Sequence, residues 1–219
     1  MVYLPRMNEP RPPVPGHGFT DGVGGEVLAF IWETAKIVLI SLAIIVPIRY
    51  YLVQPFFVKG ESMLPNFQDK DYIIVDKLSY RLSEPRRGDV VIFRYPRDPQ
   101  EYFIKRIIAL PGETILIHKG KIIIYNELFP NGGELDESLY LPKGLEPQLC
   151  SIQMPYRLDQ NEFFVMGDNR DHSSDSRCWG PVNESFLSGR AWLRLWPLEQ
   201  SFFIERLNPF VERLTEPLR

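Results

Sequence analysis

Hydrophobic and polar residues are distributed differently near the N-terminus and in the rest of the chain. Residues 1–26 are rich in Pro and Gly, and their hydrophobic residues show no helical or strand periodicity, which predicts a flexible tail. Apolar residues then dominate from Val27 to Val58. The uncharged run Ile37–Ile48 alone is short for a membrane span, but a helix over Trp32–Tyr51 would be about 30 Å long and would cross a bilayer core.

The residues at the two ends of this apolar segment suit the two interfaces of a membrane. Lys36 and Arg49 can extend their charges into water, and Trp32, Tyr50 and Tyr51 lie where aromatic belts form. No Ala-x-Ala-like cleavage site follows, so residues 27–53 are interpreted as an uncleaved transmembrane anchor rather than a removable signal peptide. A buried or interfacial helix is the alternative. Basic residues before the apolar run favour a cytoplasmic N-terminus, although acidic residues there weaken the bias.

Downstream of the anchor, short apolar runs alternate with turn residues. The strand candidates are Tyr72–Val75, Asp89–Phe93, Phe103–Leu110, Thr114–His118, Lys121–Tyr125, Glu162–Met166 and Ala191–Leu195. Two of them flank Lys119-Gly120 and predict a hairpin. Many short strands with few helical periods are typical of an all-β domain, here an antiparallel barrel- or sandwich-like core over residues 54–205.

Two parts of the chain after the anchor carry weaker patterns. Residues 127–156 have little period, and together with the hairpin they are interpreted as an inserted region of about residues 114–160. Residues 206–219 are interpreted as a C-terminal tail. The stretch from Phe202 onward is equally compatible with a short helix.

The composition narrows the classes of function. The 219 residues carry a net charge of −3, so electrostatics gives no support to a nucleic-acid partner. The two cysteines, Cys150 and Cys178, have no close-spaced cluster of Cys and His around them, and we expect no metal and no cofactor. The two thiols are compatible with a disulfide in an oxidising compartment and equally with free cysteines.

Chemistry is indicated first by the segment Gly60–Pro65. Its serine, Ser62, follows the anchor and precedes a strand candidate, where loops present side chains. Alone this is weak evidence, because a solvated loop serine has the same appearance.

The second indication is a lysine inside the apolar strand candidate Phe103–Leu110. Because side chains alternate between the faces of a strand, Lys105 shares a face with Phe103, Ile107 and Ala109. Burial there would lower the pKa of the amine, and a neutral amine can act as a general base that activates a serine without histidine. The alternative is that Lys105 reaches solvent at a barrel rim.

Histidine-based catalysis has little support. His17 lies in the tail, His118 in the hairpin and His172 in a polar loop. A Ser–His–Asp triad would have to use His172, and nothing in the sequence favours it.

Together these motifs resemble those of the type I signal peptidases, which are serine–lysine dyad proteases. Six segments are similar to the family's sequence boxes, in order, over most of the chain from Tyr51 to Pro197. They are Gly60–Pro65, Asp71–Lys77, Arg87–Phe93, Tyr102–Arg106, Ala109–Glu113 and Gly167–Arg177. One such box is weak evidence, but six in order leave coincidence a poor explanation.

The resemblance implies that Ser62 is the nucleophile and Lys105 the general base. It also implies that the backbone N–H of Ser62 holds the oxyanion, because Gly60 stands where another branch of the family has an assisting serine.

Five further residues take supporting roles by the same resemblance. Ser173 would orient the lysine amine. Arg106, which cannot lose its proton, would pair with Asp168. Asp175 and Arg177 would form a second ion pair near the site.

The implied fold is an all-β core with a smaller inserted β region. The implied substrates are signal peptides of exported preproteins, cut after small residues at Ala-x-Ala type sites. The residues that would line the substrate pockets are Phe56, Val58, Met63, Phe103 and Ile104. The remaining partner is membrane lipid, in a bacterial-type cytoplasmic or thylakoid-like membrane that the chain crosses once, with the catalytic domain on the outer or lumenal side.

Two other functions compete with this one. A self-cleaving repressor on a similar β core would need an N-terminal DNA-binding domain, and residues 1–25 are too short and Pro-rich for a helix-turn-helix. A membrane-tethered β binding module without catalysis would explain the anchor and the strands. It would not explain a lysine on an apolar strand face.

Overall fold

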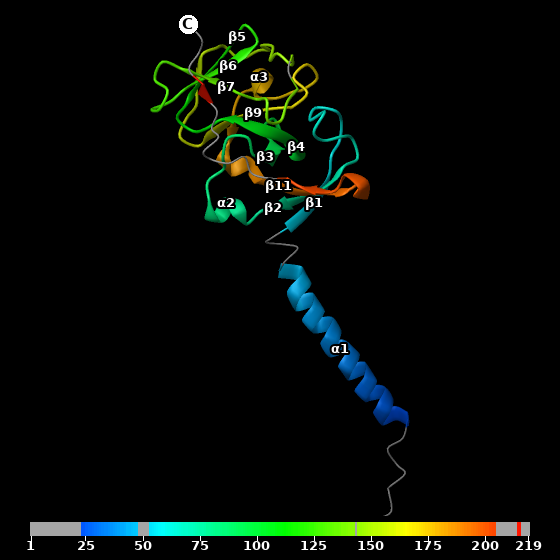
Figure 1. The fold of residues 1–219 in the computed structure, drawn as a ribbon. Helices are drawn as coiled ribbons and strands as arrows, with labels where there is room; N and C mark the ends of the chain where they lie inside the picture. The colour runs from blue at the N-terminus through cyan, green and yellow to red at the C-terminus, as the bar shows by residue number, and fades with distance from the viewer. Residues whose placement is uncertain (1–22, 48–52, 143, 205–213, 216–219) are drawn as a thin grey trace, which may run out of the picture. The chain divides into compact units, whose positions relative to one another are not determined.

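The computed structural model describes residues 23–47, 53–142, 144–204 and 214–215 (Figure 1). The chain divides into two compact units, Met1–Val46 and Pro47–Arg219. The predicted N-terminal tail lies mostly outside the described residues.

The first unit contains one long apolar helix, α1, which runs from Val23 to Pro47. Its segment Gly25–Pro47 is long and apolar enough to cross a membrane. The helix begins earlier than the predicted anchor of residues 27–53. Residues 48–52 lie outside the description, and Val53 already belongs to a strand. The prediction of an apolar helix ahead of an all-β domain is confirmed.

The second unit is built on an antiparallel sheet in the order β1-β2-β11-β3-β4-β9-β10, with β12 paired to β11. The strands are β1 (Val53–Phe57), β2 (Tyr72–Asp76), β3 (Val90–Tyr95), β4 (Asp98–Ala109), β9 (Glu162–Met166), β10 (Val182–Asn183), β11 (Leu187–Trp196) and β12 (Phe202–Phe203).

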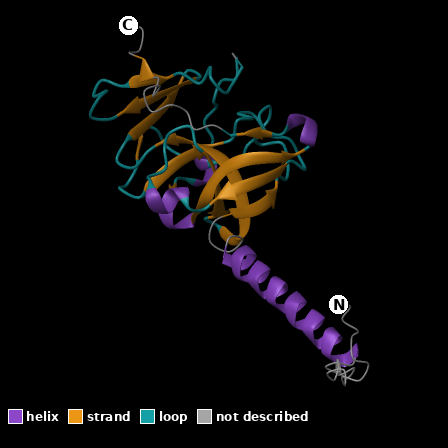
Figure 2. Cartoon of the chain, turned by 60° about the horizontal axis from the view of Figure 1, so that its bottom comes forward, coloured by secondary structure: helices purple, strands orange, loops and turns teal. Residues whose placement is uncertain are grey.

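This sheet is strongly curled (Figure 2). Three strands separate β1 from β4 in the sheet order, which would place them about 19 Å apart in a flat sheet. The ring centroids of Phe56 on β1 and Tyr102 on β4 are nevertheless only 5.2 Å apart. The concave face holds an apolar cluster made of Val58, Met63, Phe67, Ile73, Val75, Val90, Ile92, Ile104 and Ala191.

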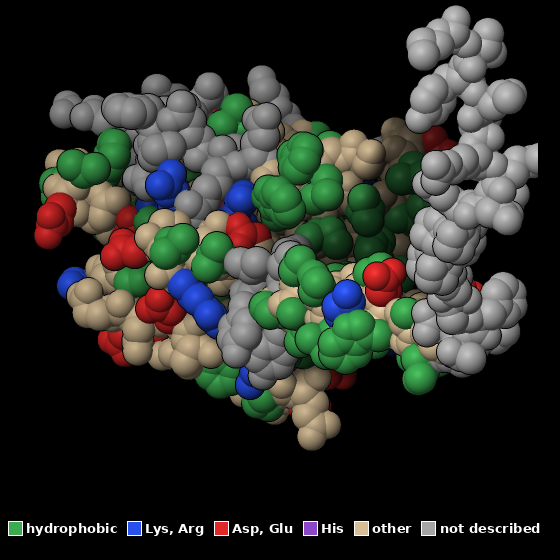
Figure 3. All heavy atoms as spheres, turned by 90° about the horizontal axis from the view of Figure 1, so that it is seen from below, with side chains coloured by type: hydrophobic (Ala, Val, Ile, Leu, Met, Phe, Trp, Pro, Cys, Tyr) green, Lys and Arg blue, Asp and Glu red, His purple; other side chains and the backbone are tan. Residues whose placement is uncertain are grey.

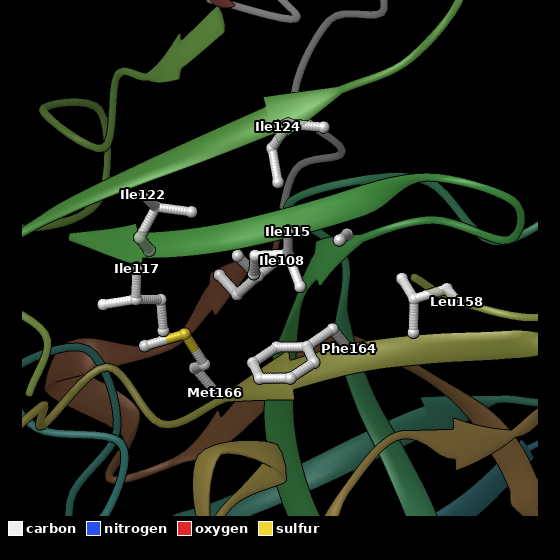
Figure 4. Close-up of a cluster of buried hydrophobic side chains, with 9 residues drawn as sticks. Ile108, Ile115, Ile117, Ile122, Ile124, Leu158, Phe164 and Met166 are labelled. Carbon is white, nitrogen blue, oxygen red and sulfur yellow. The ribbon is translucent and has the colours of Figure 1, made fainter. Parts of the chain in front are cut away.

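A second, smaller sheet has the order β13-β7-β6-β5-β8. Its strands are β5 (Thr114–His118), β6 (Lys121–Tyr125), β7 (Gly133–Leu135), β8 (Tyr156–Arg157) and β13 (Leu214–Thr215). The hairpin of β5 and β6 has the predicted bounds. Its isoleucines pack against Ile108, Phe164 and Met166 of the larger sheet, so the two sheets share one apolar core (Figure 4).

The remaining described elements are short. They are the helices α2 (Ser79–Leu82) and α3 (Ser176–Trp179) and the 3-10 turns η2 (Glu184–Phe186) and η3 (Leu198–Gln200). The C-terminal stretch differs from its prediction as a tail or short helix. Phe202–Phe203 pair with β11, and Leu214–Thr215 pair with β7.

Candidate functional site

Ser62 lies in the loop between β1 and β2, and local backbone geometry sets its position. Gly60 has φ +84°, a left-handed conformation that favours glycine, and its N–H donates to Asp69 Oδ1 at 2.8 Å. A serine at position 60 would therefore be strained whatever its side chain contributed. Among the described residues the Ser62 N–H donates no backbone hydrogen bond, which leaves it available to a ligand.

Lys105 lies on β4, which is buried on both faces from Ile104 to Ala109 as the apolar pattern predicted. The lysine is 4 % exposed. Its Nζ lies 2.7 Å from Ser62 Oγ and donates a second hydrogen bond to the Ile104 carbonyl at 3.0 Å. The two residues lie 43 positions apart in the chain, and the curled sheet brings them into direct contact.

Burial lowers the pKa of Lys105 to about 8, because a charged amine is poorly solvated in this position. The carboxylates of Asp175 and Asp168 act in the opposite direction and raise the pKa, while Arg177 lowers it. An amine with this pKa is partly neutral near neutral pH and can accept a proton from a hydroxyl within hydrogen-bond reach.

The loop after β9 holds the serine loop in place. The Asn169 backbone N–H donates to the Ser62 carbonyl at 3.0 Å, and its side chain donates to the Glu61 carbonyl at 3.1 Å. Gly167 permits this close approach, because a β-carbon there would overlap both Ser173 Oγ and the Ser62 carbonyl oxygen.

Ser173 lies beside this contact but makes no hydrogen bond to the lysine. Its hydroxyl oxygen is buried and makes no hydrogen bond to another described residue. The hydroxyl nevertheless lies near the Asp175 carboxyl and helps to lower the pKa of that group. Its role in orienting Lys105 stays a prediction.

Arg106 and Asp168 lie together and form a bidentate pair. Arg106 Nε and Nη2 donate to the two Asp168 oxygens at 2.8 and 2.6 Å, and Nη1 donates to the Gly88 carbonyl at 2.9 Å. The guanidinium carbon lies 4.1 Å from the ring centroid of Tyr140. Asn66 donates to the same carboxylate at 2.8 Å. The guanidinium and the carboxylate are thus buried and paired with each other.

Asp175 and Arg177 also form a bidentate pair, with both hydrogen bonds at 2.8 Å. Asp175 caps the N-terminus of α3 and accepts a hydrogen bond from the Gly167 N–H at 3.0 Å. Burial raises the pKa of this carboxyl, but hydrogen bonds and the charge of Arg177 outweigh burial and lower it overall. This pair therefore connects α3 to the loop that carries Ser173.

The structure joins Cys150 and Cys178 in a disulfide, with Cα atoms 4.9 Å apart. The sequence left this pairing open. Cys178 lies in α3, and the N–H groups of Ser151 and Ile152 both donate to the Arg177 carbonyl at 3.0 Å. The bond therefore attaches the inserted region to the helix that carries the second ion pair.

A pocket of about 440 Å³ opens beside Ser62 and Lys105. Four of the five residues predicted to bind substrate line it, namely Phe56, Val58, Phe103 and Ile104. The fifth, Met63, is buried in the apolar cluster of the concave face instead.

Both walls of the pocket are strand edges without a partner on the pocket side. Among the described strands β1 pairs with β2 alone, and β4 pairs with β9 only from Arg106 onward. An extended peptide can add to such edges as a further strand.

Sequence reasoning missed a third buried ion pair in the same loop. Arg170 donates to Glu137 through Nη1 and Nη2 and to the Gly167 carbonyl through Nε at 3.1 Å. Arg170 lies inside the Gly167–Arg177 segment, but its partner Glu137 comes from the inserted region. The hydrophobic pattern of that region has no periodicity from which the position of a side chain could be predicted. Tyr140 was missed for the same reason, whereas Asn66 was missed because it lies just outside the Gly60–Pro65 segment.

A histidine mechanism gains nothing from the geometry. His172 is exposed, and its backbone N–H donates to the Asn169 carbonyl at 3.2 Å. No hydrogen bond joins the described His172 and Ser62 side chains. His118 is exposed on β5, and His17 lies outside the described residues.

Several known proteins with similar sequences are signal peptidases. The family model described as signal peptidase, peptidase S26, matches residues 31–196. A signal peptidase I of Leptolyngbya laminosa is 34% identical over 178 residues, covering 78% of this chain and 82% of its own. A probable signal peptidase I-1 of a Synechocystis species is 32% identical over 175 residues, covering 77% and 84%. A crystal structure of a signal peptidase I from Enterococcus faecalis is 30% identical with TM-score 0.39, covering 49% of this chain and 97% of that one.

Proposed function

The chain belongs to the S26 family of signal peptidases and has the enzymatic function of a signal peptidase I, and we propose that Ser62 and Lys105 are its catalytic dyad. The observation that carries this proposal is the distance of 2.7 Å between Lys105 Nζ and Ser62 Oγ, on a lysine that is buried. Burial and contact are the two conditions that a lysine base requires.

The reaction follows from these contacts. Lys105 in its neutral form takes the proton of Ser62 while Oγ attacks the scissile carbonyl, and the resulting ammonium returns a proton to the leaving amine. The Ser62 N–H stabilises the oxyanion of the tetrahedral intermediate. Water then attacks the acyl-enzyme with Lys105 again acting as the base. Ser173 and the two pairs Arg106–Asp168 and Asp175–Arg177 hold the lysine and its loop in position.

We propose that this pocket selects small residues before the cut. Phe56, Val58, Phe103 and Ile104 give it apolar walls, and Met63 is packed in the neighbouring apolar cluster. A narrow apolar pocket rejects large side chains by overlap and polar side chains by desolvation. Signal peptides with Ala-x-Ala type ends are therefore the proposed substrates.

We further propose that the enzyme is anchored in a membrane by α1 and also contacts lipid through its β domain. Phe57 and Trp196 are 71% and 57% exposed, and both adjoin Tyr72 on β2. Trp192 and Phe203 form a neighbouring exposed ring pair, with centroids 5.6 Å apart. Figure 3 shows hydrophobic side chains exposed on the face that is viewed from below. Large apolar patches of this kind are typical of membrane-contacting surfaces.

The proposed orientation places the N-terminus in the cytoplasm and the residues after Gln54 on the outer or lumenal side, where the ends of exported chains emerge. Protease added to intact spheroplasts should digest the β domain. Complete protection of that domain would contradict the orientation.

The decisive experiment for the dyad is cleavage of a preprotein by the full chain in detergent. Ser62→Ala should abolish cleavage and leave the thermal unfolding of the protein unchanged, because Ser62 is a partly exposed loop residue. Cleavage at the ordinary rate by this variant would refute the proposal. It would favour a binding module or another nucleophile.

A further inference from the structure

The concave face of the curled sheet changes from apolar to polar at one end. Four strands contribute residues to the apolar cluster of this face, counting Phe56, which packs against it. On each of these strands, the next residue that points to the same face beyond the cluster is polar. Phe56 is followed by Gln54, Val75 by Lys77, Ile92 by Arg94 and Ile104 by Tyr102. The strand registers place all four steps at the same end, because Gln54 lies opposite Val75 and Arg94 lies opposite Tyr102. We call these four polar residues the basic rim.

The basic rim lines a second pocket, of about 310 Å³. Tyr102 lines this pocket and also the pocket beside the dyad, so the two are neighbours along the cleft. Arg81 adds a third cation to the lining, and Glu184 supplies the opposing carboxylate. The pocket therefore has an excess of positive charge.

Two of these cations have no partner of their own in the part of the chain that the structure describes. Among the described residues, Lys77 and Arg94 form no ion pair and donate no side-chain hydrogen bond. This contrasts with the arginines around the dyad, Arg106, Arg170 and Arg177, each of which is bound to a carboxylate. The unpaired charges of the rim are thus available to a ligand of negative charge.

A substrate peptide extended along β1 would reach this rim. From Val58, beside the dyad, to Gln54 is a distance of four residues, or about 13 Å of strand. Alternate side chains of a strand point to the same face. Suppose that the side chains of the first and third residues before the cut enter the apolar pocket. The side chain of the fifth residue before the cut then points at the basic rim.

We propose that the basic rim is a substrate subsite that selects an acidic side chain at the fifth residue before the cut. Lys77 and Arg94 attract the carboxylate, and Tyr102 and Gln54 offer hydrogen bonds at the boundary with the apolar pocket. A lysine or arginine at this substrate position is disfavoured by the same charges. This inference rests on the proposed function and adds a specificity determinant to it.

The test uses one preprotein in three forms, with Asp, Asn or Lys as the fifth residue before the cut, and the full chain in detergent at low salt. The expected order of kcat/KM is Asp, Asn, Lys, with a ratio on the order of tenfold between Asp and Lys. Lys77→Gln combined with Arg94→Gln should bring that ratio to about one. Lys77→Glu combined with Arg94→Glu, which leaves the lining with a net negative charge, should reverse the order. Arg157→Gln, a matched loss of an exposed arginine on β8, should change nothing.

Equal cleavage of the three forms by the unaltered protein would overturn the subsite. A preference that survives in the double variant would also overturn it. If instead the double variant lost activity on all three forms equally, and only with vesicles of anionic lipid present, the rim would be a headgroup site and the proposal would be wrong.

A binding measurement separates this inference from the proposed function. The binding of fluorescent nine-residue peptides to the Ser62→Ala protein is measured by anisotropy. The peptides carry Asp, Asn or Lys as the fifth residue before the cut, and their affinities should follow the order Asp, Asn, Lys. If the affinities follow this order but the unaltered protein does not cleave the preprotein, the catalytic proposal is wrong and the subsite stands. If the unaltered protein cleaves the preprotein but neither assay distinguishes the three residues, the subsite is wrong and the catalytic proposal stands.

Discussion

The pH dependence of cleavage tests the lysine base most directly. Lys105 acts only in its neutral form, and burial lowers its pKa to about 8. Because the free amine appears as pH rises through the pKa, activity must increase from acid to alkaline pH and level off above the pKa.

The structure sets the size of the effect. With a pKa of about 8, roughly 9% of Lys105 is neutral at pH 7, half at pH 8 and roughly 90% at pH 9. The value of kcat/KM should therefore rise about tenfold between pH 7 and pH 9 and then remain level. A lysine with an ordinary pKa near 10.4 would give activity that still climbs about tenfold per pH unit up to about pH 10.

The assay is initial-rate cleavage of a preprotein by the full chain in detergent between pH 6 and pH 10. Lys105→Arg should lower the rate by on the order of 10³-fold at every pH, because arginine keeps the charge but cannot release its proton. Lys121→Arg, an exposed lysine paired with Glu134, is the matched control and should behave like the unaltered protein.

Two results would refute this reasoning. Substantial cleavage by Lys105→Arg with Ser62 intact would exclude the lysine as base and return His172 to consideration. A profile that keeps rising to pH 10 would show that Lys105 is not desolvated in the working enzyme.

Three further predictions concern the surroundings of the dyad. Gly167→Ala should reduce cleavage at least about a hundredfold, since the new methyl group displaces the Ser62 loop, and a melting curve separates this from unfolding. Arg177→Gln removes a cation that lowers the pKa of Lys105, so the midpoint of the pH profile should move to higher pH; a midpoint that stays or falls would contradict this. Phe57→Ser combined with Trp196→Ser should weaken vesicle binding by a fragment that starts near Gln54 and leave its cleavage of short soluble peptides unchanged; unaltered vesicle binding would exclude this strip as the lipid contact.

Strands with a clear local signal could be predicted with their bounds. Thr114–His118, Lys121–Tyr125 and Glu162–Met166 have the same limits in sequence and structure, because alternation and turn residues mark both ends. The strand β1 was missed, since Val53–Phe57 continues the apolar run of the anchor without a change of period. β4 begins at Asp98 rather than Phe103, because its polar first half is stabilised by pairing with β3 and not by burial.

The candidate site divides along the same line. Ser62 and Lys105 could be singled out from local sequence, because one follows the anchor and the other interrupts an apolar strand. The partners that come from the inserted region could not be singled out. Glu137 and Tyr140 lie in a segment without period, and only the folded insertion brings them to Arg170 and Arg106. The disulfide belongs to this second group, because sequence spacing does not determine a Cα separation.

The arrangement of charges around Lys105 explains why burial decides its pKa. Two carboxylates lie near the amine, and either of them unpaired would hold the lysine in its charged form. Asp168 is instead bound by Arg106, and Asp175 is bound by Arg177, each through two hydrogen bonds. Each pair is close to neutral as a unit. The carboxylates can therefore accept the hydrogen bonds that position the loops without raising the pKa of Lys105 so far that it stays protonated. A buried ion pair contributes little net stability, because desolvation offsets its attraction. Its value at this site is that it supplies rigid hydrogen bonding at low net charge, which is the condition under which a buried lysine can serve as a base.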